Sequence, residues 1–412
     1  MINALIDLFA ACGTAPPQAV PAHLCAGYIY TLWASPELKP NYLDTTATIQ
    51  DVCLGWDWTN NKPRLYVVTG NTTISRIEAP WDYSDSPEMS AALTLNFSPA
   101  PTRILAICSD ASYLYVLYGV VDSLLYVAKF STITGSSTPV ATIAAGGAFN
   151  PYHAFDYLTT RMILADDTHL GIVRTPYPPA TDLEVHTVDT ALSTVQSELI
   201  SGGIFPDLRG PCLATDGTLM YFIGFTEIPG VSRDYSLYRF AISDLSYDSF
   251  PIATVAAGEG YWSYQPTGMV VVGENVVISN ALGCLWIYSM LDHEVYDVAK
   301  VEGSIALVDP HDDYGIMLGF DGLNVWGVFL ELNEDPAPDT VHWEAYKISA
   351  AYFNRHNRNT DFTNVAPVSR VHIDFDDVSS NAPNGRWVFD GRDMWLVFRS
   401  GQIFRICAPG LR

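Results

Sequence analysis

The stretch from Arg386 to Ile406 most strongly limits what this chain can fold into. It reads RWVFDGRDMWLVFRSGQIFRI, in which Asp390-Gly391 and Ser400-Gly401 separate three short apolar runs. Short runs of β-forming residues divided by Asp-Gly and Ser-Gly are typical of β-hairpins. The stretch therefore predicts an antiparallel meander, which is too small to bury a face alone. Other segments must supply sheets that pack against it.

The same sequence pattern recurs along the chain: an apolar run, an Asp turn, a second apolar run, a short turn and a third apolar run. Copies begin near residues 51, 104, 153, 212, 267, 304 and 386, and a further apolar piece follows most of them. Each copy therefore predicts four strands, and four-stranded units of roughly 40–50 residues arranged radially make a β-propeller. We expect an all-β, closed β-propeller of seven four-stranded blades. Six or eight blades are alternatives, because the third and last copies are irregular.

This blade phrasing resembles that of generic β-propellers, over roughly residues 27–406, and the resemblance concerns architecture only. The seventh copy leaves no room for a fourth strand. We therefore predict that Tyr28–Trp33 (YIYTLW) closes the ring as the outer strand of the last blade and protects its edge. The predicted domains are an N-terminal extension and linker over 1–26 and a propeller over 27–412, with an insertion at about 349–385.

Charge and hydropathy exclude several classes of function. The net charge is -24 and only 16% of the 412 residues are charged. General nucleic-acid binding needs clustered Lys and Arg, which such a chain lacks. No apolar run reaches the length of a membrane span. The start of the chain has no basic residue before its apolar run, so we expect synthesis in the cytoplasm without a signal peptide.

A set of acidic residues at the early turns of the copies is the first candidate site. Its members are Asp57, Asp110, Asp166, Asp216, Asp309 and Asp390. In a propeller these turns would lie on one face around the axis, where glycosidases can pair two carboxylates as acid and base. A glycan-acting hydrolase or lyase using this axial acid ring is therefore one alternative, and a ring of metal or ligand acids is another. Ordinary turn chemistry explains the same pattern, since Asp is common in tight turns.

Two further segments carry candidate residues. His372, Asp374 and Asp376 alternate along a predicted strand and so share one face. A cation such as Ca²⁺ could lie between the two carboxylates, as could Arg370 or water; no other cofactor is predicted. The second segment is the basic stretch of an otherwise acidic chain. It contains Tyr352, Arg355, His356 and Arg358. Arg beside aromatic residues is typical of protein interfaces, so this stretch is a polar loop or a contact with another subunit or acidic partner.

The sequence lacks a Gly-x-Ser-x-Gly, a His-Glu-x-x-His, a phosphate loop followed by Lys and a dinucleotide fingerprint. The leading hypothesis is a non-enzymatic structural or interaction propeller. The sequence style resembles virion proteins of tailed bacteriophages, at the tail tip, nozzle or receptor-contacting region. That resemblance implies location in the virion, contacts with other virion proteins and a homo-oligomer. The alternatives are the glycan-acting enzyme and a cellular protein- or glycan-binding propeller, cytoplasmic or exported.

Overall fold

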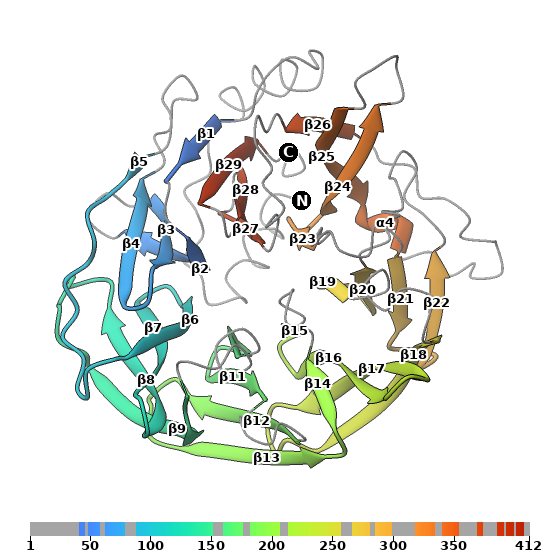
Figure 1. The fold of residues 1–412 in the computed structure, drawn as a ribbon. Helices are drawn as coiled ribbons and strands as arrows, with labels where there is room; N and C mark the ends of the chain where they lie inside the picture. Colours follow the sequence, from blue (N-terminus) through green and yellow to red (C-terminus); the bar gives the residue numbers. More distant parts are fainter. Residues whose placement is uncertain are drawn as a thin grey trace.

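The computed structural model describes fifteen segments of the chain. They are residues 41–45, 48–57, 62–78, 88–150, 160–175, 182–206, 213–256, 266–280, 285–298, 318–333, 340–353, 369–373, 385–390, 393–398 and 401–407. Within them the fold is all-β, with seven antiparallel sheets that follow one another in chain order. Figure 1 shows these sheets arranged radially around one axis, which makes the protein a seven-bladed β-propeller.

The strands of the first four blades alternate in direction from the axis outward. The first blade holds β2 (Ile49–Asp57), β3 (Lys62–Thr69), β4 (Thr73–Glu78) and β5 (Glu88–Met89). The second holds β6 (Arg103–Ser109), β7 (Tyr113–Gly119), β8 (Leu124–Ser131) and β9 (Ala141–Ala148). The third holds β10 (Arg161–Leu164), β11 (His169–Arg174), β12 (Asp182–Asp189) and β13 (Val195–Ser201). The fourth holds β14 (Ile204–Pro206) and β15 (Leu213–Thr215), both paired with β16 (Leu219–Ile228), then β17 (Ser232–Ala241) and β18 (Tyr247–Ala256).

The remaining three blades complete the ring. The fifth holds β19 (Pro266–Val272), β20 (Asn275–Asn280), β21 (Leu285–Ser289) and β22 (Glu294–Val298). The sixth holds β23 (Leu318–Phe320), β24 (Asn324–Asn333), β25 (Thr340–Ser349) and β26 (Ser369–Ile373), with a short helix α4 (Ala350–Phe353) after β25. The seventh holds β27 (Gly385–Phe389), β28 (Asp393–Phe398), β29 (Gln402–Cys407) and, at its outer edge, β1 (Asn41–Asp44).

An N-terminal strand closes the ring, as predicted, but that strand is β1. It runs antiparallel to β29, with Leu43 opposite Ile403. Thr45 extends the contact, because its N–H and its Oγ1 both donate to the Gly401 carbonyl, at 3.1 and 3.0 Å. The predicted closing strand, Tyr28–Trp33, lies outside the described residues. A strand of only four residues, NYLD, gives too weak a hydrophobic pattern to be found from the sequence.

The predicted strand order is wrong by one strand in the third and sixth blades. With copies beginning near 153 and 304, Arg161–Asp166 and Tyr314–Phe320 are predicted to be the second strands of their blades, but the strands in these stretches, β10 and β23, are the innermost of the described strands. The stretches predicted to precede them lie outside the described residues. The outer strand β13 was missed because most of its residues are exposed. In the sixth blade the outer strand β26 falls within the predicted insertion and pairs with β25.

The hydrophobic core consists of layers between neighbouring blades rather than one central cluster. Leu117 of the second blade packs with Leu170 of the third in one such layer. Leu65 of the first blade packs with Trp395 and Val397 of the seventh across the closure of the ring. Burying the apolar face of each sheet against the next stabilises both, because apolar surface leaves water on each side. Within the described part of the chain, no helix is long and apolar enough to cross a membrane.

Candidate functional site at the propeller axis

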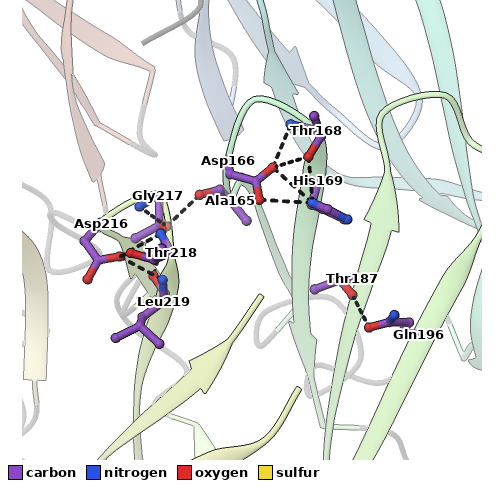
Figure 2. A network of polar contacts seen from close by, with 11 residues as sticks. Ala165, Asp166, Thr168, His169, Thr187, Gln196, Asp216, Gly217, Thr218 and Leu219 are labelled. Carbon is purple, nitrogen blue, oxygen red and sulfur yellow. Dashed lines mark hydrogen bonds and ion pairs between the residues drawn. The ribbon is translucent and has the colours of Figure 1, made fainter. Parts of the chain in front are cut away.

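In the described part of the chain, an Asp begins the hairpin between the innermost strand and its neighbour in five blades. In the fourth blade, Asp216 donates its backbone N–H to the Leu219 carbonyl at 3.2 Å. Its Oδ1 accepts the backbone N–H groups of Thr218 and Leu219, each at 2.8 Å (Figure 2). Gly217 follows with a φ of +88°, as a two-residue hairpin loop with Gly at its first position requires. The carboxylate therefore holds the turn closed.

The other carboxylate oxygen of this Asp binds an aromatic side chain five residues further on. The pairs are Asp110 with Tyr115 Oη at 2.7 Å, Asp216 with Tyr221 Oη at 2.8 Å, Asp321 with Trp326 Nε1 at 2.7 Å and Asp390 with Trp395 Nε1 at 2.8 Å. We call this unit the Asp–aromatic turn. A Tyr or Trp at the fifth position after each Asp is the sequence signal, and our sequence analysis missed it.

The aromatic ring of the Asp–aromatic turn reaches the next blade. Tyr115 packs with third-blade residues and its hydroxyl lies 3.5 Å from the Thr190 carbonyl. The Tyr221 hydroxyl lies 3.3 Å from Met290 Sδ of the fifth blade. The Trp326 ring centre is 5.8 Å from that of Trp387 in the seventh blade. One carboxylate thus fixes both a turn and the contact between two blades.

The third blade keeps the turn but not the aromatic residue. Asp166 accepts the Thr168 N–H at 2.6 Å and lies 3.0 Å from His169 Nδ1 (Figure 2). The fifth position is Gly171, and a Cβ added there would lie 2.1 Å from Sδ of Met220 in the fourth blade. The Met side chain therefore occupies the place of the missing ring. Beside this turn, the hydroxyl of Thr215 in the fourth blade donates to the Ala165 carbonyl at 2.7 Å.

Four of the predicted ring acids, Asp110, Asp166, Asp216 and Asp390, lie in these turns at the ends of innermost strands. Burial alone would raise the pKa of Asp216, but hydrogen bonds from Leu219, Thr218 and Tyr221 outweigh it and lower the pKa. Asp57 ends β2, and its side chain is outside the described residues, as is Asp309. The sixth-blade turn instead contains Asp321, which the one-strand error hid from the sequence analysis.

The two other predicted sites are only partly described. His372 lies in β26, and its side chain, Asp374 and Asp376 fall outside the described residues. Among the residues that the structure does describe, no three His, Cys, Asp or Glu side chains form a group that could hold a metal ion. Tyr352 lies in α4, while Arg355, His356 and Arg358 are outside the described part. Asn275 anchors the end of α4, donating from Nδ2 to the Phe353 carbonyl at 2.9 Å.

A cavity of about 220 Å³ opens among the innermost strands of the third to seventh blades. These strands surround the centre of the ring in Figure 1, where β15, β19, β23 and β27 are labelled. Its lining is mostly apolar and includes Met269, Phe320 and Trp387. Among the described residues of the lining, the charged ones are Arg161 on β10 and Arg386 on β27. The sequence analysis singled out neither.

Arg386 forms an ion pair with Asp51, a buried residue of β2 in the first blade. The Asp51 carboxylate also accepts the backbone N–H of Ile107 in the second blade, at 2.8 Å. Burial raises the pKa of Asp51, against the opposing effect of the Arg386 and Arg161 guanidinium groups. This carboxyl group therefore joins the first, second and seventh blades beside the axis, where the chain closes on itself.

A second polar array lies further out, on the third blade. Glu184 forms an ion pair with Arg174, with 3.0 Å between Oε2 and Nε, and lies 3.3 Å from His186 Nε2. His186 Nδ1 lies 2.7 Å from the hydroxyl of Ser197. Serine, histidine and carboxylate in this order also occur in nucleophilic enzymes. Here His186 and Ser197 are direct cross-strand partners on β12 and β13, so the array is a polar link between outer strands.

Comparison with known proteins bears on the fold alone. No protein-family model matches the chain, and no curated protein matches its sequence. A solved structure of YCF48 bound to D1 peptide is similar, with a TM-score of 0.48 and 10% identity over 90% of this chain and 96% of that one. BamB from Moraxella catarrhalis has a TM-score of 0.46 and 8% identity over 89% and 85%. The computationally designed Ika8 protein has a TM-score of 0.44 and 10% identity over 89% and 98%.

Proposed function

We propose that this propeller is a non-enzymatic structural and interaction module. The observation that carries the proposal is that the Asp carboxylates of the inner turns already have hydrogen-bond partners at both oxygens. At Asp110, Asp216, Asp321 and Asp390, one carboxylate oxygen accepts turn N–H groups and the other binds an aromatic donor. A general acid or base must exchange protons with a substrate, whereas these groups already serve the turn and the blade contact.

Within this class, we propose a bacteriophage virion component at the tail tip, nozzle or receptor-contacting region. The support comes from the sequence style together with the surface that the fold exposes. Large apolar side chains stand exposed at hairpin tips, such as Val231 between β16 and β17 and Leu291 between β21 and β22. A net charge of -24 also disfavours adhesion to the DNA that passes through a tail. The partners would be other virion proteins and further copies of this chain.

The test is the protein composition of particles made by cells that carry the gene. Particles are purified by density gradient, the chain is quantified by mass spectrometry, and antibodies against it locate it by electron microscopy. We expect a fixed ratio to the other structural proteins and labelling at the tail. Absence from the particles, with the chain free in the lysate, would contradict the virion role and favour the cellular binding propeller.

A separate assay tests the non-enzymatic part of the proposal. The purified chain is incubated with host-surface polysaccharides, and newly formed reducing ends are measured for wild type, Asp216→Asn and Asp390→Asn. We expect no turnover by any of the three. Turnover by the wild type that either variant abolishes, with folding intact by circular dichroism, would establish the glycan-acting alternative instead.

A further inference from the structure

We propose that the axial cavity is a binding site for a flat, uncharged, apolar ring system. Such a ligand is additional to the interaction role proposed above, and neither proposal depends on the other. The cavity, of about 220 Å³, is formed by strands from five blades, so the ring itself sets its walls. An apolar protein cavity of about 150 Å³ is large enough to bind benzene. The axial cavity therefore has room for a fused pair of rings.

Buried apolar side chains from several blades form most of the wall. Leu213, Met269, Leu318 and Trp387 lie on β15, β19, β23 and β27, and each is only 6–9% exposed. Bulk water therefore has little access to this wall. An apolar ligand would leave water on entering and would gain dispersion contacts with these side chains. The rings of Phe320 and Trp387 favour a flat partner, because aromatic groups pack by offset stacking or edge to face.

The charged and hydroxyl side chains in the described lining have partners within the protein. Arg386 forms an ion pair with Asp51, and Arg161 Nη1 donates to the carbonyl of the preceding residue at 2.8 Å. Thr267 is 3% exposed, and its hydroxyl lies 3.1 Å from the hydroxyl of Ser279. None of these contacts involves a ligand, so the site is defined by its apolar walls rather than by a charge.

Backbone groups add a small polar component to the cavity. β19 and β23 are the innermost strands of their sheets, and each pairs with its sheet neighbour on one side. Their other edges face the centre of the ring in Figure 1, where Gly268 and Gly319 contribute to the lining. A carbonyl on such an edge can accept one N–H from a ligand, whereas several buried ring nitrogens would leave some unpaired at a cost. Indole, with its single N–H, is the simplest ligand of this class.

The binding test uses two probes of matched size and shape. Indole and purine share a fused-ring skeleton, but purine has nitrogen at ring positions where indole has carbon. Binding to the full chain is measured by isothermal titration calorimetry at several temperatures. We expect saturable binding of indole with a negative heat-capacity change, which is the signature of apolar burial. Purine should show no saturable binding.

The ring can belong to a free small molecule or to a tryptophan side chain of a partner, and a third probe separates the two sources. N-acetyltryptophanamide carries the indole ring with a peptide group on each side. Binding as tight as that of indole would assign the site to a partner's side chain. Binding of indole alone would assign it to a free molecule.

Two variants that fill the cavity decide whether it is the site. Val270→Phe and Ile163→Phe place a larger side chain in the cavity from the fifth and the third blade. We expect each to weaken indole binding by about tenfold or more, because the added ring takes the space of the ligand. Circular dichroism melting checks the fold. The matched control is Val121→Phe, at a residue that is 39% exposed between β7 and β8, and it should bind as the wild type does.

A crystal of the wild type soaked with a brominated indole locates the ligand without any substitution. The anomalous signal of the bromine should lie among the innermost strands, next to Met269 and Trp387. This measurement decides the site even where a filling variant does not fold. A bromine position elsewhere on the molecule would overturn the proposal.

Three results in solution would also overturn it. They are no saturable binding of indole at millimolar concentration, binding of purine as tight as that of indole, and wild-type affinity in a folded filling variant. A chain that is found in particles but binds no indole contradicts this proposal alone. A chain that is absent from particles but binds indole contradicts the virion role alone. The two proposals are therefore distinguishable.

Discussion

In each Asp–aromatic turn, one carboxylate accepts hydrogen bonds from the backbone of the hairpin and from an aromatic side chain. In the fourth blade Asp216 closes the hairpin through backbone N–H groups and holds the buried hydroxyl of Tyr221 at 2.8 Å. An amide oxygen can accept the same N–H groups, and an amide N–H can donate to a phenol oxygen. Replacement by a side chain without polar atoms would leave the hydroxyl without this acceptor in the interior. The role of Asp216 is therefore structural.

This gives a mutational prediction. Asp216→Asn should change the free energy of unfolding by less than about 1 kcal/mol, whereas Asp216→Ala should cost about 1–3 kcal/mol. Urea denaturation measures both. The control is Asp244→Ala, since Asp244 also caps a turn, accepting the Ser246 N–H at 3.0 Å. It should cost less than Asp216→Ala. Equal losses for the two alanine variants would show that the aromatic contact adds nothing.

The lowered pKa of Asp216 predicts a dependence of stability on pH. A carboxyl group whose pKa is lower in the folded state stabilises the fold above its unfolded pKa, near pH 4, and loses that contribution as the pH falls through the folded pKa. The wild type should therefore lose more stability than Asp216→Asn between about pH 5 and about pH 2. Urea unfolding at a series of pH values measures this. Parallel curves for the two proteins would contradict the assignment.

At the scale of the strand, close approach between inner strands sets which residues fit. Gly319 of β23 faces β27, where the Trp387 Cβ would lie 2.3 Å from an added Cβ. The Trp387 Cβ is attached to the backbone and cannot rotate away. Gly319→Ala should therefore lower the free energy of unfolding by about 1–3 kcal/mol through overpacking. At Gly147 the nearest atom is 3.7 Å from the added Cβ, so Gly147→Ala should melt like the wild type. Thermal melting of both variants tests this.

The closing strand provides the second prediction at this scale. β1 holds four residues, which pair with β29 and continue into the contacts of Thr45 with Gly401. Removing residues 1–40 keeps this strand, and removing residues 1–45 exposes the edge of β29. We expect the longer deletion to lower the melting temperature sharply or cause aggregation. The shorter deletion should lower the melting temperature less. Equal melting of the longer deletion and the full chain would contradict closure by β1.

The strands that sequence analysis found and missed differ in one physical respect. Inner strands are buried on both sides by neighbouring blades, so β7 and β28 read as continuous apolar runs and were found. Outer strands such as β13 face solvent, and their hydrophobic pattern is weak. The candidate site was harder to predict for another reason. Asp51 and Arg386 are far apart in sequence and meet only because the ring brings their strands to one axis.

At the scale of the whole molecule, two sets of contacts close the ring, one near the axis and one at the outer rim. Near the axis, Asp51 joins the first, second and seventh blades through Ile107 and Arg386. At the rim, β1 belongs to the sheet of β29 although the two lie at opposite ends of the sequence. A propeller closed in this way has its free surfaces on the two faces and the outer rim. Contacts with other molecules must therefore form there or at the opening of the axial cavity.

The last prediction concerns assembly through the basic segment that follows α4. Arg355 and Arg358 follow a helix that is anchored in the core by the buried Phe353. A chain of net charge -24 resists self-association unless local cations meet carboxylates of the neighbour, and Arg pairs with carboxylates in a bidentate manner. Most homo-oligomers have closed point-group symmetry. We expect an oligomer in the wild type and dissociation in Arg355→Glu/Arg358→Glu.

Multi-angle light scattering over a range of concentrations measures the assembly state. The matched control is Arg233→Glu/Arg239→Glu, which changes the net charge equally at residues of β17 that pair with Glu227 and Asp248. If the contact is local, the control stays oligomeric while the 355/358 variant becomes monomeric. Loss of assembly in both variants would instead indicate general charge repulsion, because each adds the same negative charge. A wild type that remains monomeric at high concentration, and finds no partner in the particle, would refute assembly through this segment.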